Sequence, residues 1–193
     1  MRDKHHWLLW PGLLAIGPLA IVLVYLAQAL HLPVTLGAFK DLNEIFAVMI
    51  LGVIFTALVI RSARQHNLLY WLLGGFALIA WLREIHFEWT HKGVYILLLI
   101  LISLVWWWRE RLKPLAQAGV FLPWFKGTMV IYLLSVLISR RVFRGLLPDE
   151  ELMHTALEEV LENVAHSMLL ITAGIGDWRR TESSALAPKP GPN

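Results

Sequence analysis

Ionisable side chains gather in two stretches of an otherwise apolar chain, residues 81–91 and 148–178, and most of them are glutamate or histidine. Carboxylates and imidazoles together form the ligand set of zinc, manganese or non-haem iron. The chain contains no cysteine, which excludes disulfides, thiolate ligands and a cysteine nucleophile. We therefore expect a bound divalent metal, one or two ions of Zn, Fe or Mn. The expected ligands are Glu44, Glu84, Glu88, His91, Glu158, Glu162 and His166.

In residues 148–178 the polar side chains are spaced to share one face of a helix. Residues four apart fall on the same side of a helix with 3.6 residues per turn, and apolar residues fill the other side here. The polar residues of this face are His154, Glu158, Glu162 and His166, with Glu151 and Glu159 beside them.

A helix lying flat on a membrane surface shows the same pattern. The length of residues 148–178 nevertheless favours a helix that crosses the membrane. The segment without formal charge, residues 164–176, is only about 20 Å long, whereas the hydrocarbon core of a bilayer is about 30 Å thick. A crossing helix therefore draws Glu162 and His166 into the membrane. Because each ionised group there costs about 2.5 to 3.5 kcal/mol, such side chains need a partner, a cavity or a cation. We interpret this face as the functional site.

The other stretch contains a Glu-x-x-His pair, Glu88 and His91, which we expect on one arc of a single helix with Glu84. Over these four residues the chain resembles the ligand pair of ferritin-like di-iron bundles, and the resemblance implies that one helix offers two metal ligands. A salt-bridged helix end is the alternative interpretation. Further candidates for substrate binding or ligand support are Arg83, His86, His154, Glu159, Arg140, Arg141 and Arg144.

The composition predicts an all-α integral membrane bundle. Hydrophobic residues make up 58% of the chain and charged residues 16%. Such a composition is typical of a multi-pass membrane protein. We expect a single six-helix domain over residues 1–178 and a disordered cytoplasmic tail over residues 179–193. The small net charge of +3 indicates an excess of basic residues in the cytoplasmic loops rather than a surface that binds nucleic acid.

Six apolar segments are expected to span the bilayer: residues 7–30, 41–60, 68–91, 93–108, 124–142 and 148–178. Asp41 and Glu44 are spaced as a capping box at the start of the second segment. Residues 61–67 should form a basic connector, and residues 114–124 a loop or surface segment.

The distribution of arginine and lysine favours cytoplasmic termini. The basic connectors around residues 61–64 and 109–113 then fall inside, as the positive-inside rule requires, whereas residues 140–144 are an exception. We expect a bacterial inner (plasma) membrane. In this orientation the ionisable helix ends all reach the outer side, where they would face one another.

These features favour a metal-dependent membrane enzyme, a hydrolase or a di-iron-type oxidoreductase acting on a lipid or other amphiphile. Arg83 and the arginines of residues 140–144 would suit an anionic headgroup. A proton-coupled or metal-ion transporter using the same carboxylates is an alternative. A non-catalytic scaffold subunit is a further one, in which ion pairs such as Arg83 with Glu158 satisfy the charges. The expected partners are the bilayer and an amphiphilic substrate. The sequence leaves open whether the protein forms a homo-oligomer.

Overall fold

Helices form the described part of the chain, which confirms the all-α class. The computed structural model describes residues 6–30, 36–85, 90–116 and 121–175, and within these ranges it contains no strand. Side chains are described for residues 12–30, 43–85, 93–114 and 123–175. The helices are α1 (His6–Ala29), α2 (Leu36–Gln65), α3 (Leu68–Glu84), α4 (Thr90–Trp107), α5 (Arg109–Ala116), α6 (Phe121–Ser139) and α7 (Glu150–Gly174).

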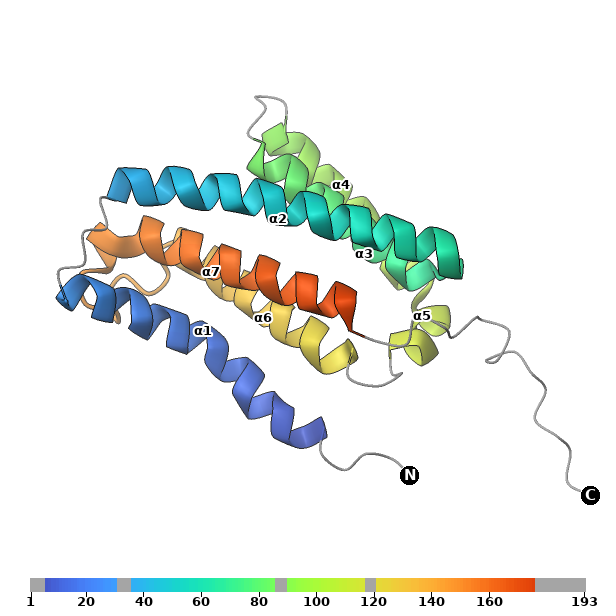
Figure 1. Cartoon of the computed structure of the whole chain (residues 1–193), viewed down its shortest axis with the longest axis horizontal. Helices are drawn as coiled ribbons and strands as arrows, with labels where there is room; N and C mark the ends of the chain where they lie inside the picture. The colour runs from blue at the N-terminus through green and yellow to red at the C-terminus, as the bar shows by residue number, and fades with distance from the viewer. Residues whose placement is uncertain (1–5, 31–35, 86–89, 117–120, 176–193) are drawn as a thin grey trace, which may run out of the picture.

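Helix α7 lies at the centre of the bundle and packs against α1, α2 and α6 (Figure 1). One apolar cluster joins it to α2 and α3 through residues such as Leu58, Leu73 and Leu169. A second cluster joins it to α1 and α6 through residues such as Leu13, Ile131 and Leu161. Helix α4 packs on α3 at the edge of the bundle. Since α7 contributes to both clusters, most of its apolar side chains are buried within the bundle.

The turn between α2 and α3 is short because two residues supply both helix caps. His66 adopts the left-handed conformation at φ 48°, and its N–H donates to the carbonyl of Ser62 at 2.8 Å. Asn67 then caps α3 by accepting from the N–H of Leu69 at 2.9 Å. This turn places α2 and α3 side by side and antiparallel. Because α3 is much the shorter helix, its last turn lies beside the middle of α2, where Trp81 packs against Phe55.

Two local predictions for α2 are wrong. The helix begins at Leu36, so Asp41 lies inside it and does not form a capping box with Glu44. The helix also continues to Gln65, so Arg61 belongs to α2 rather than to a connector. Arg61 is buried because its guanidinium lies 4.1 Å from the ring centroid of Tyr70 and donates to the carbonyls of Ala173 and Ile175. A cation is favourable there because it meets the carbonyl end of α7.

The segment expected as a loop or surface segment after α4 is partly helical. Helix α5 covers Arg109–Ala116, and α6 begins at Phe121, a few residues before the expected start of the fifth apolar segment. The ends of α6 and α7 also lie inside the expected limits, with α6 ending at Ser139 and α7 running over Glu150–Gly174.

Large apolar side chains cover the outside of the bundle. Among the described residues they lie on six helices, for example Leu23 on α1, Met49 on α2, Trp71 on α3, Leu99 on α4, Leu133 on α6 and Leu152 on α7. Two stretches, Gly12–Ala29 and Asn43–Gln65, are long and apolar enough to cross a membrane, and Gly93–Trp107 and Pro123–Ser139 are shorter apolar helices. Contiguous exposed apolar surface of this extent marks a surface that contacts lipid or protein.

Candidate functional site

An ion pair inside the bundle joins α3 to α7. Nη2 of Arg83 lies 2.5 Å from Oε1 of Glu162, and the same oxygen accepts from the hydroxyl of Ser135 on α6 at 3.1 Å. The Glu162 side chain is 7% exposed, whereas that of Arg83 is 45% exposed. The carboxylate is therefore held in the interior by partners from two other helices, and the guanidinium reaches it from the surface.

One turn further along α7, His166 is almost fully buried and faces Tyr132 on α6. The Tyr132 hydroxyl lies 2.6 Å from Nδ1 of His166, and the Tyr132 ring packs edge-on against Phe76 of α3. Among the described residues, Nε2 of His166 has no hydrogen-bond partner. If Tyr132 donates to Nδ1, then Nε2 carries the proton; if Nδ1 donates, then Nε2 has a free lone pair. The imidazole is thus held by a hydrogen bond at Nδ1, while Nε2 can bind a further group.

These contacts belong to a series of polar pairs between α6 and α7, which we term the polar ladder. It consists of Ser135 with Glu162, Tyr132 with His166, and Thr128 with Thr172, whose hydroxyl oxygens are 3.5 Å apart. The residue number falls along α6 as it rises along α7, as antiparallel helices require. Helix α7 rises by about 15 Å between the first and last pair.

Two further carboxylates of the described residues lie near Arg83 at the Glu162 end of the polar ladder. Glu158 lies 3.9 Å from Nη2 of Arg83, and Glu84 also acts electrostatically on that arginine. One guanidinium therefore faces three carboxylates among the described residues. A proton or another cation near Glu162 would reduce the repulsion among these carboxylates.

A second polar pair lies beside this cluster on the opposite flank of α7. The amide Nδ2 of Asn163 donates to Oδ1 of Asn43 on α2 at 3.0 Å. Glu44, one of the expected ligands, follows Asn43 directly in α2. The middle of α7 thus makes polar contacts with Asn43 near the start of α2 and with Arg83 at the end of α3. The gathering of the ionisable helix ends at the outer side of a membrane stays a prediction.

The expected arrangement of Glu84, Glu88 and His91 on one helix is wrong. Helix α3 ends at Glu84, and His91 belongs to α4. His86 and Glu88 lie outside the described residues, and the side chain of His91 is not described either. Glu159 lies on α7 with a partly buried side chain.

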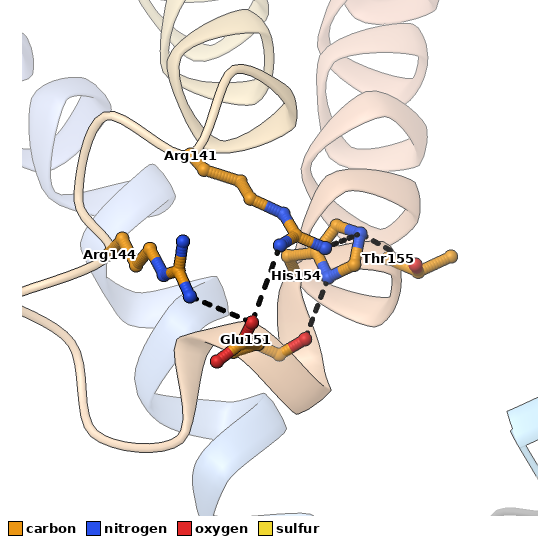
Figure 2. Close-up of polar contacts among 5 residues, drawn as sticks. All are labelled: Arg141, Arg144, Glu151, His154 and Thr155. Atoms are coloured by element: carbon orange, nitrogen blue, oxygen red, sulfur yellow. Dashed lines mark hydrogen bonds and ion pairs between the residues drawn. The ribbon is translucent and has the colours of Figure 1, made fainter.

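The remaining candidates form a separate cluster where α6 connects to α7. Figure 2 shows Arg141 and Arg144 reaching toward Glu151, with His154 beside them. Nη2 of Arg144 donates to Oε1 of Glu151 at 2.9 Å, and Nη1 of Arg141 lies 3.7 Å from the same oxygen. Arg140 is exposed in the same turn. This cluster is exposed, in contrast to the buried polar ladder.

The described side chains do not form a metal site by themselves. No group of three His, Asp or Glu residues within the described ranges is placed to hold an ion. Glu162 already has a cationic partner in Arg83. Metal binding by the expected ligand set stays a prediction.

Tyr132 and Ser135 were not among the residues expected from the sequence. Thr128, Tyr132 and Ser135 recur at intervals of four and three residues in an apolar segment, and this spacing could have indicated a polar face. Comparisons with models of known protein families, with curated proteins and with solved structures each found no match.

Proposed function

We propose that the protein is a multi-pass integral membrane protein with six transmembrane helices. The exposed apolar residues around α1, α2, α4 and α6 support a surface that contacts lipid. The shortest of the six long helices, α3, has 17 residues and is about 25 Å long, which a slightly thinned bilayer accommodates. The cytoplasmic termini and the bacterial inner membrane expected from the sequence stay predictions.

Within this bundle we propose that the polar ladder moves protons, as in a proton-coupled carrier. The observation that carries the proposal is the buried Glu162, which faces Arg83 and lies one turn from His166 on α7. Ionisable residues inside membrane bundles commonly form proton relays. The Thr128–Thr172 pair extends the polar ladder toward the opposite end, and a carrier needs access from both ends.

Protonation of Glu162 would weaken its ion pair with Arg83. Ionised Glu162 pairs with Arg83, and protonated Glu162 no longer attracts the guanidinium as strongly. Release of Arg83 would loosen the contact between α3 and α7. Tyr132 fixes the imidazole of His166, so that its free nitrogen can give or take the proton at a constant position.

Proton movement into liposomes tests this proposal. The purified chain is reconstituted with a trapped pH-sensitive dye, and an inward pH gradient is applied. We expect flux above that of protein-free liposomes, with a loss of at least about tenfold in Glu162→Gln, since the variant cannot ionise. Glu110→Gln on α5, where Glu110 is exposed and pairs with Lys113, is the matched control. Equal flux in wild type and Glu162→Gln would contradict the proposal.

A metal-dependent membrane enzyme acting on an amphiphile is the second candidate. The free Nε2 of His166 favours it, because metal-bound imidazoles are usually held by a hydrogen bond at the other nitrogen. Elemental analysis of the detergent-purified chain, compared with His166→Ala, tests this candidate. Bound metal that disappears in the variant would support it, and metal-free protein after gentle purification would contradict it.

A further inference from the structure

The turn that connects α6 to α7 holds an arginine where glycine is strongly favoured. The N–H of Val142 donates to the carbonyl of Leu137 at 3.0 Å, and the N–H of Arg141 donates to that of Ile138 at 2.7 Å. This pair of hydrogen bonds is the Schellman motif, whose end residue adopts a left-handed backbone. Arg141 is that residue, at φ 53°. A side chain in this conformation costs about 1 kcal/mol relative to glycine, which points to a role for the arginine itself.

Arg141 forms a pair with Arg144 around a single carboxylate. Oε1 of Glu151 accepts from Nη2 of Arg144 and lies 3.7 Å from Nη1 of Arg141, and Nη2 of Arg141 lies 3.4 Å from Nε2 of His154 (Figure 2). Two guanidinium groups share one negative charge. The arginine pair therefore keeps unused donors at the surface.

Exposed apolar side chains flank this pair of arginines. Val142, Leu146 and Leu152 are 58%, 78% and 73% exposed. The turn is fixed from beneath, because the hydroxyl of Tyr25 donates to the carbonyl of Pro148 at 2.5 Å. A fixed surface with two guanidinium groups and projecting leucines is complementary to an anionic headgroup beside acyl chains.

We propose that Arg141 and Arg144 form a clamp for the phosphate of an anionic phospholipid, with Leu146 and Leu152 in contact with its acyl chains. This inference rests on the proposed membrane location but not on proton movement. Glu151 holds the two guanidinium groups side by side, so that both can donate to one phosphate, and the leucines select a lipid over free phosphate.

Lipid titration of the full chain in detergent tests the clamp. The probes are fluorescent phosphatidylglycerol, phosphatidylcholine with the same acyl chains, and inorganic phosphate as a competitor. We expect tighter binding of phosphatidylglycerol, weakened about fivefold by Arg144→Gln and about thirtyfold by Arg141→Gln with Arg144→Gln. Arg141→Lys with Arg144→Lys keeps the charge but loses the planar fork, and should also weaken binding. Equal binding of the two lipids, or displacement by phosphate at the lipid's own concentration, would overturn the proposal.

Arg141→Gly separates the role in binding from a role in the fold. Glycine relieves the left-handed backbone, so this variant should melt at a higher temperature while it binds phosphatidylglycerol about fivefold more weakly. Leu146→Gln, which changes no charge, should also weaken lipid binding. An Arg141→Gly variant that binds the lipid as wild type does would overturn the clamp. Absence of proton flux in liposomes would contradict the carrier alone, and a chain that stays in solution without detergent would contradict the membrane location.

Discussion

The carboxylate of Glu162 lies in the interior of the bundle, 2.5 Å from an arginine whose side chain is half exposed. Loss of one partner therefore has a different effect on each charge, because one is buried and the other can reach solvent. Without Arg83, a carboxylate stays buried with only the hydroxyl of Ser135 beside it. Without the charge of Glu162, the guanidinium can still reach solvent.

Arg83→Gln should consequently cost more stability than Glu162→Gln. We expect a loss of about 2 kcal/mol for the first, below the 3 to 5 kcal/mol of fully buried pairs because Arg83 is half exposed, and about 1 kcal/mol for the second. Denaturant unfolding in detergent measures both, and the double variant should resemble Glu162→Gln alone. The reverse order would show that the pair is not buried as described.

Tyr132→Phe should release the imidazole of His166 from its fixed orientation. The variant removes the hydroxyl that lies 2.6 Å from Nδ1, leaving a buried nitrogen without a partner, which costs about 1 to 3 kcal/mol. The ¹⁵N shifts of the His166 ring should move toward a mixture of tautomers. Tyr95→Phe on α4, where the tyrosine is exposed, is the control. Unchanged ring shifts in Tyr132→Phe would contradict the contact.

Adjacent substitutions in the turn between α2 and α3 should act in opposite directions. His66→Gly removes a side chain from a left-handed backbone and should stabilise the fold by about 1 kcal/mol. Asn67→Ala removes the cap of α3 and should destabilise it by about 1 kcal/mol. Thermal unfolding of the two variants gives the sign of each change. A loss of stability in His66→Gly would exclude the described turn.

Gly127 on α6 allows close packing against both α1 and α7. An added Cβ there would lie 3.1 Å from Cε of Met168 and 3.3 Å from Cβ of Leu13. Gly127→Val should therefore lower the free energy of unfolding by about 1 to 3 kcal/mol. Gly12→Val on α1 is a matched control, since no atom lies within 4 Å of its added Cβ. Similar effects of the two changes would rule out this helix contact.

The sequence was sufficient to predict the helices because each long apolar segment became one. Helix limits were less predictable where a distant contact decides them. The polar residues after Ile60 remain helical because Arg61 is covered by Tyr70 and meets the end of α7, far away in the chain.

The polar face of α7 was predictable, but its partners were not. A spacing of four residues places Glu158, Glu162 and His166 on one side of any helix, whatever surrounds it. The contact of His166 with Tyr132 depends instead on how α6 slides along α7, which local sequence does not determine. Arg83 was considered as a partner of Glu158, yet its shorter contact is to Glu162.

The central position of α7 has a consequence for biosynthesis. Arg83 is separated from Glu162 by 79 residues of sequence, and Tyr132 precedes its histidine by 34. A ribosome delivers α7 last among the described helices, so the earlier helices are made before their charged or polar groups find partners. Assembly of the protein must therefore wait for its carboxyl-terminal helix, and truncation before that point would leave an arginine for quality-control proteases to detect.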